Sequence, residues 1–192
     1  MSPAEWNPPQ PRMDFLLPHL DDAWRRLLGW LDGLTEAEFQ WRPVANVWHL
    51  EERDGRGTIT YSWIAPEPAP LPTIAWHVAH VAASLVLTAD HAFGERQKKL
   101  ADLALPLDAV GMLDYLGDCY GEFSRAVAGL NDDDLERPRF TEWGEQRSTG
   151  EIVGSAILHL VEHGAQITAL RSIYRRINTG ELSWPKDTLT SA

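Results

Sequence analysis

The segment Thr73–Ala89 constrains the fold more than any other, because it has the apolar spacing of a helix and contains no charged residue. One side of such a helix is aliphatic, and the other side carries Trp76, His77 and His80. A helix that is uncharged on both faces for four turns is typically covered on both faces by other elements. We therefore expect a helix over residues 73–94 that lies between other helices.

Three further segments, residues 13–34, 107–130 and 148–177, also repeat apolar residues at every third or fourth position. This spacing is typical of amphipathic helices. The last of these segments is nearly free of charge between Ile152 and Leu170, so we expect it to be the most buried helix. Four long helices joined by connections of unequal length predict an all-α four-helix bundle.

Two capping boxes mark helix starts: Thr35 precedes Glu38 by three residues, and Ser148 precedes Glu151 by three. Between the first two long helices, β-branched and aromatic runs at 47–50 and 58–63 flank the glycine-containing segment 54–57. This pattern predicts a small β-hairpin insertion. The proline-rich stretch that follows, residues 66–72, is expected to form an extended linker.

The length of 192 residues suits one domain of ordinary size. We expect a loose N-terminal arm over residues 1–11, a single helical domain over 12–180 and a C-terminal tail over 181–192. Proline is frequent in the first of these segments, which has few apolar anchors.

Charge and composition narrow the functional classes. The net charge of −11 would repel a phosphate backbone, so we expect no nucleic-acid partner. The longest uncharged run is too short to span a bilayer, and the N-terminus lacks the pattern of a secretory signal, so we expect no membrane association. The single cysteine, Cys119, fits a reducing compartment, and the predicted location is the cytoplasm.

The candidate metal-binding residues are histidines. His159 and His163 are four residues apart on the last predicted helix, so their side chains project from one face and can bind a transition metal together. His80 lies in the middle of the uncharged helix, where it can converge with them into a three-histidine site with an open position. The competing interpretation is that buried histidines here only form hydrogen bonds in the core.

His77 competes with His80 for the metal, but it lies about 60° away around the helix, so both could not easily reach one ion. His19, His49 and His91 have no evident partner, and we expect them to be solvated or to cap helices.

Residues 159–163 also spell the H-x-x-E-H pattern of inverted zinc proteases. That class needs an acidic ligand well downstream in a larger domain, and only 29 residues follow His163, so proteolysis is set aside. Glu162 could instead orient an imidazole from outside the ligand set.

Together these motifs resemble the DinB/YfiT-like superfamily. Residues 73–80, Thr-Ile-Ala-Trp-His-Val-Ala-His, are similar to the superfamily's second-helix signature. The last-helix pattern H-x-x-x-H-x-x-Q/H-I is matched from His159 to Ile167, and Leu170-Arg171 follows as in the superfamily. The stretch 34–43 resembles the segment after its first helix.

The resemblance implies an up-down-down-up bundle that holds a divalent metal, most often zinc or nickel, with His80, His159 and His163, and it excludes His77. Relatives of this kind include thiol-dependent transferases and isomerases that use mycothiol or bacillithiol. The implied function is a divalent-metal-dependent S-transferase or isomerase that takes a small-molecule substrate and a low-molecular-weight thiol.

In that reading the ion lowers the pKa of a bound thiol or water. We expect the pocket around the ion to include Trp76, His77, Gln166 and Glu162. The alternatives are a non-enzymatic metal- or small-ligand-binding bundle and a bundle without metal. The sequence leaves open whether the chain forms a homodimer.

Overall fold

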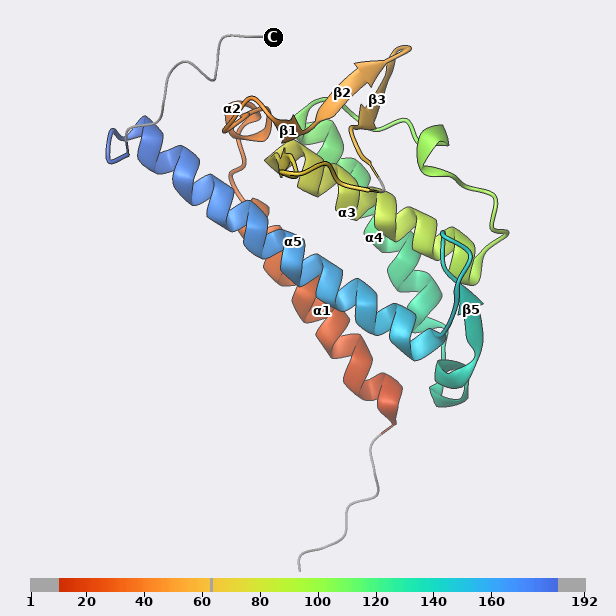
Figure 1. The fold of residues 1–192 in the computed structure, drawn as a ribbon. Coiled ribbons are helices and arrows are strands. Elements are labelled where there is room, and N and C mark those ends of the chain that lie inside the picture. Colours follow the sequence, from red (N-terminus) through yellow and green to blue (C-terminus); the bar gives the residue numbers. More distant parts are fainter. Residues whose placement is uncertain (1–10, 63, 183–192) are drawn as a thin grey trace, which may run out of the picture.

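The four long helices form an up-down-down-up bundle in the computed structural model, which describes residues 11–62 and 64–182 (Figure 1). They are α1 (Arg12–Leu31), α3 (Ile74–Thr88), α4 (Ala109–Ala128) and α5 (Thr149–Asn178). Helix α5 packs against both α1 and α3, and α3 also packs against α4. The predicted bundle is confirmed. Expectations for residues 1–10, Trp63 and 183–192 lie outside the described residues.

Short elements join the long helices. They are α2 (Glu36–Phe39), the π-helical turn η1 (Ala89–Phe93), the 3-10 turns η2 (Leu100–Asp102) and η3 (Asp132–Glu136), and strands β1 (Val47–Trp48), β2 (Leu50–Arg53), β3 (Arg56–Ile59), β4 (Leu71–Pro72), β5 (Pro138–Phe140) and β6 (Gln146–Ser148).

The predicted helix starts are confirmed by side-chain caps. Thr35 and Glu38 form a complete capping box on α2, and Ser148 and Glu151 form another on α5. The hydroxyl of Thr73 accepts a hydrogen bond from the main-chain N–H of Trp76, so α3 begins at the threonine of the signature motif. These caps satisfy N–H groups that a helix leaves without intrahelical partners.

Helix α3 is the most buried helix, with 12 of its 15 residues buried. The expectation that the last helix would be the most buried is wrong: Leu158 is 63% exposed and Val161 is 37% exposed. The reason is position, because α3 lies between α4 and α5, whereas α5 keeps a solvent-facing side. Among the helices described here, none has the length and apolar character needed to cross a membrane.

The hairpin between α1 and α3 exists, but its strands are shifted from the predicted ones. Strands β2 and β3 pair from Leu50 opposite Ile59 to Arg53 opposite Arg56. Asp54 and Gly55 between them both have positive φ, as a two-residue type I′ turn requires. Because the turn has only two residues, the charged residues on either side of it belong to the strands: Glu51, Glu52 and Arg53 to β2, and Arg56 to β3. The earlier strand β1 instead pairs in parallel with β4, at the end of the proline-rich stretch.

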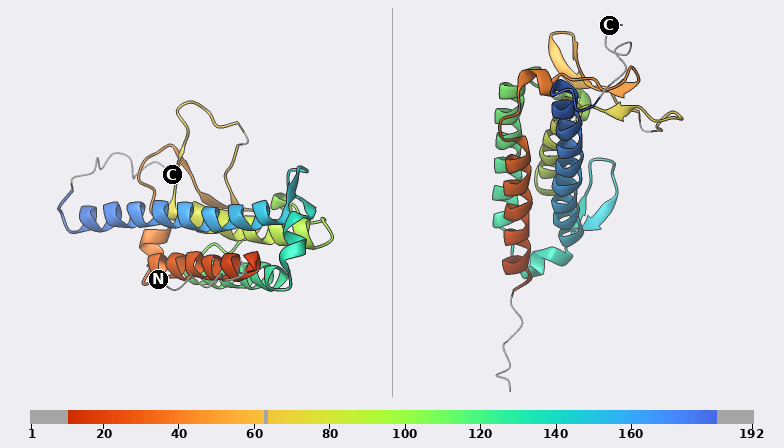
Figure 2. Two further views of the ribbon diagram at one scale, coloured as in Figure 1. Left: turned by 90° about the horizontal axis from the view of Figure 1, so that it is seen from below. Right: turned by 90° about the vertical axis from the view of Figure 1, so that its left-hand side faces the viewer.

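A second hairpin was not predicted from the sequence. Strands β5 and β6 pair antiparallel between η3 and α5. Figure 2 shows this hairpin beside the N-terminal half of α5. Its strands have only three residues each, too short for an alternating apolar pattern to stand out.

A buried ion pair ties α5 to the end of α1 and to α2. The Arg171 side chain donates from Nε and Nη2 to the Glu38 carboxylate, both at 3.2 Å, and Arg175 lies 3.3 Å from the same carboxylate. Nη1 of Arg171 donates to the main-chain oxygens of Trp30 and Asp32, where α1 ends. A helix leaves its last carbonyl groups without partners, so a single guanidinium both neutralises the carboxylate and caps α1.

Helices α1 and α5 meet at Gly164, where a side chain would collide with the ring of Trp30. We expect Gly164→Ala to lower the free energy of unfolding by about 1–3 kcal/mol, because the extra methyl group overpacks this contact. Gly154→Ala is the matched control on the same helix, since nothing lies within 4 Å of the position its Cβ would take. That variant should gain about 0.5–1 kcal/mol. Urea unfolding curves measure both, and equal stabilities would contradict the close packing.

Candidate metal centre

Three imidazoles from two helices converge in the bundle. His80 comes from α3, and His159 and His163 come from successive turns of α5. Each offers a ring nitrogen, and the three nitrogens lie within 4.8 Å of one another. The ring centroid of His80 lies 4.9 Å from that of His159 and 4.9 Å from that of His163. The centroids of His159 and His163 are 4.4 Å apart. The structure thus brings together the three residues predicted as ligands.

The donor set fits a divalent transition metal. Zinc binds imidazole nitrogen at 2.0–2.1 Å, so two nitrogens on one ion are at most about 4 Å apart. The three imidazole nitrogens lie within 4.8 Å of one another, close to this limit. Within the part of the chain that the structure describes, Nε2 of His159 is buried and has no hydrogen-bond partner. A buried polar atom without a partner is costly, and a metal ion would use its lone pair.

Burial keeps these imidazoles neutral. It lowers the pKa of His80 to about 3 and that of His163 to about 2, and in both cases the neighbouring histidines add to the shift. Burial also lowers the pKa of His159, against a weaker opposing effect of Glu162. A metal ligand must carry a lone pair rather than a proton, so at neutral pH the three rings are in the form that binds metal.

His77 lies beside the cluster and outside it, as the helical spacing predicted. Its Nδ1 lies 2.8 Å from Nδ1 of His163, within hydrogen-bonding distance. Its side chain is 3% exposed, and burial lowers its pKa to about 4, to which the charge of His159 adds.

The other predicted pocket residues lie on the same two helices as the histidines, and none of them lines the cavity described below. Trp76 stacks on the ring of His80, with centroids 4.5 Å apart and planes 13° from parallel, and its Nε1 donates to the main-chain oxygen of Thr60. Trp76, itself held by this hydrogen bond, therefore restrains the orientation of the His80 ring by stacking on it. Gln166 hydrogen-bonds His163, but it and Glu162 are exposed on α5.

A cavity of about 420 Å³ opens beside the cluster, and both His80 and His159 line it. The remaining wall is mainly apolar and comes from α3, α5 and the two hairpins, including Ile59, Tyr61, Leu87, Phe140 and Ile152. This volume is typical of a small-molecule site.

Sequence reasoning missed the polar side of this cavity. Glu142, Trp143 and Arg147 line it from the turn and second strand of the β5–β6 hairpin. Burial raises the pKa of Glu142, partly offset by its own main-chain N–H and by His91. The available signal was a glutamate next to a tryptophan in a glycine-containing turn, but nothing in the sequence connects that turn to histidines on α3 and α5.

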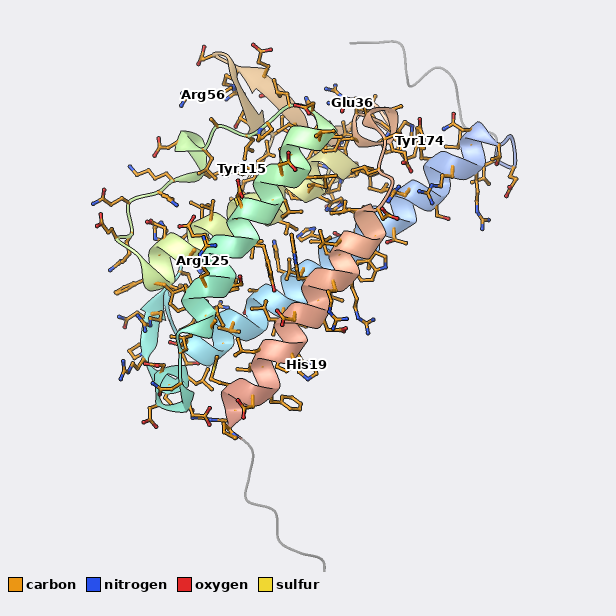
Figure 3. The ribbon with its side chains drawn as sticks, turned by 180° about the vertical axis from the view of Figure 1, so that it is seen from behind. His19, Glu36, Arg56, Tyr115, Arg125 and Tyr174 are labelled. Atoms are coloured by element: carbon orange, nitrogen blue, oxygen red, sulfur yellow. The ribbon has the colours of Figure 1, made fainter. Side chains whose placement is uncertain are left out.

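The remaining histidines lie outside the cluster. His19 is exposed on α1 (Figure 3). His91 is half-buried, and its Nε2 lies 2.9 Å from the main-chain oxygen of Lys98. His49 is half-buried next to the first hairpin, 3.7 Å from Glu51.

Comparisons with known proteins identify the family and support the fold. The family model described as the DinB superfamily matches residues 19–167. A solved structure described as a conserved protein from Enterococcus faecalis is 18% identical, covers 88% of this chain and 97% of its own, and superposes with a TM-score of 0.54. At that identity the likeness concerns the fold alone. A search of curated proteins found no match.

The buried imidazoles predict how the metal-free protein responds to acid. Above the ordinary histidine pKa of 6.5 they are neutral in both the folded and the unfolded chain, so they do not change stability. Below it, the unfolded chain binds protons that the folded chain does not. The free energy of unfolding should therefore fall by about 1.4 kcal/mol per pH unit for each such imidazole.

Urea unfolding in the presence of chelator, at about pH 7.5 and about pH 5, measures this loss. His163→Asn should show a smaller loss than the wild type, because one such imidazole is gone. An equal loss in the two proteins would contradict the assignment.

Proposed function

Because the chain belongs to the DinB superfamily, we propose that it is a divalent-metal-dependent enzyme acting on small molecules. The observation that carries the proposal is the convergence of His80, His159 and His163 beside a cavity, with a buried and unpartnered Nε2 on His159. Three ligands from the protein, with a position left for water or substrate, are the pattern of catalytic rather than structural zinc sites.

Zinc and nickel are the ions we propose, since both suit imidazole ligands. Held by the neutral imidazoles of His80, His159 and His163, such an ion would keep its positive charge and would lower the pKa of a bound thiol or water. We propose a thiol S-transferase or isomerase with a low-molecular-weight thiol as co-substrate.

The residues of the cavity support this chemistry. Its aliphatic and aromatic wall would exclude water and hold the apolar part of a substrate. The carboxyl of Glu142, with its pKa raised by burial, is suited to accept a proton from a substrate and return it. Arg147 contributes a positive charge at the hairpin side, where it also pairs with Glu145 at 3.1 Å.

Other parts of the proposal rest on composition. The net charge of −11 disfavours nucleic acid as a partner, and a single cysteine, buried in the structure, suits the cytoplasm. We propose that the partners are small molecules and that neither nucleic acid nor membrane is among them. A homodimer stays an open prediction.

Metal content tests the site directly. Protein purified after incubation with Zn²⁺ or Ni²⁺ and dialysis should hold about one ion per chain, and His159→Ala should hold roughly a tenth of that or less, because losing one of three ligands removes much of the binding free energy. His19→Ala, at an exposed histidine on α1, is the control and should match the wild type. Elemental analysis measures the content, and an unchanged value in His159→Ala would refute the site.

Activity separates an enzyme from a metal- or ligand-binding bundle without turnover. We expect the zinc- or nickel-loaded protein to accelerate conjugation of mycothiol, bacillithiol or glutathione to an electrophile such as 1-chloro-2,4-dinitrobenzene, and chelation to abolish this. Glu142→Gln keeps the shape but cannot take up a proton, so kcat should fall by about 10²-fold with metal content unchanged.

Glu52→Gln is the control, since Glu52 is exposed on β2 and does not line the cavity. Stoichiometric metal without turnover on any thiol would favour the non-enzymatic binding module.

A further inference from the structure

His77 is a buried histidine that the three-ligand site does not use. Its ring lies against that of His163, with centroids 5.0 Å apart, and the two Nδ1 atoms are separated by 2.8 Å. At this distance one nitrogen donates its proton and the other accepts it. The contact joins the first turn of α3 to the middle of α5, 86 residues apart in sequence.

A count of protons limits how this pair can be arranged. Each neutral imidazole carries one N–H. If His77 donates from Nδ1, the proton of His163 is on Nε2, and that nitrogen has no lone pair for a metal. If His163 donates from Nδ1 to His77, Nε2 of His163 is unprotonated and can bind the ion. Only the second arrangement leaves His163 able to act as a ligand through Nε2.

We propose that His77 is the positioning residue of the metal site, accepting the Nδ1 proton of His163 and so fixing this ring with Nε2 available to the ion. The inference rests on the proposed function, because it assigns a role toward that metal. Metal-binding histidines generally donate their second ring N–H to an acceptor that fixes tautomer and orientation, and loss of that acceptor weakens binding by about 10–100-fold. Here the acceptor is another imidazole.

The packing around His77 suits this role. Its side chain is 3% exposed, and the ring of Trp76 meets it edge-on with centroids 5.5 Å apart. The same indole stacks on His80. Trp76 therefore orients both His80, a proposed ligand, and His77, the partner of the proposed ligand His163. Gln166 also hydrogen-bonds His163, but it is exposed on α5 and restrains the ring less than a buried group does.

Cobalt(II) titration followed by visible absorption gives both affinity and coordination geometry. His77→Leu removes the acceptor and should bind Co²⁺ about 10–100-fold more weakly than the wild type, with altered absorption bands. His77→Asn places an amide oxygen near the position of Nδ1 and should recover most of the affinity. Val78→Ala is the matched control, because it trims the neighbouring buried residue of α3 and should lower stability without weakening Co²⁺ binding.

Nitrogen-15 NMR of histidine-labelled wild-type protein tests the tautomer without any substitution. In the zinc-loaded protein, His163 should be protonated at Nδ1 and His77 should be unprotonated at Nδ1. The opposite assignment would overturn the inference even if a variant failed to fold.

The outcomes separate this inference from the function it rests on. Wild-type protein that binds neither Co²⁺ nor Zn²⁺ would refute the metal site and the role of His77 together. If the wild type binds metal and His77→Leu binds it equally well with the same spectrum, only the positioning role is refuted. Equal losses in His77→Leu and His77→Asn would also refute it, because the hydrogen-bond acceptor would then not matter.

Discussion

Four imidazoles lie against one another between α3 and α5, and α3 has no charged side chain that could pair with them. The need of these buried rings for partners is the constraint on which the rest of the structure depends. Burial lowers the pKa values of His77, His80, His159 and His163, and repulsion from neighbouring histidines adds to the shift for all of them except His159. Neutral rings in an apolar bundle still need partners for their nitrogens. A hydrogen bond between two of them provides part of this, and a shared cation would provide the rest.

Much of the fold and of the three-histidine cluster could be predicted, because both depend on local spacing. An uncharged helix has to be covered on both faces, and α3 is. The capping residues Thr35 and Ser148 act within their own turns, so their roles can be read directly. His159 and His163 share a face because they are four residues apart, and the signature around His80 indicated the third ligand.

What the sequence could not provide depends on contacts between distant segments. Leu158 lies on the solvent side of α5 because other helices cover only part of that helix, a fact absent from its own uncharged sequence. Trp76 donates from Nε1 to the main-chain oxygen of Thr60, 16 residues earlier and outside α3, a contact that helical spacing does not reveal. Glu142 reaches the cavity because a short hairpin folds against α5, and no periodicity announces strands of three residues.

The hydrogen bonds of Arg171 have a consequence for the geometry of the candidate metal site. Sliding α5 by one residue along its axis would shift both of its imidazoles by about 1.5 Å and rotate them by about 100°, whereas coordination distances tolerate only about 0.2 Å. Arg171 sits two turns beyond His163 and grips the end of α1 and the carboxylate of Glu38 at once. The axial setting of α5, and with it the placement of His159 and His163 relative to His80, is therefore fixed two turns away from the candidate metal site.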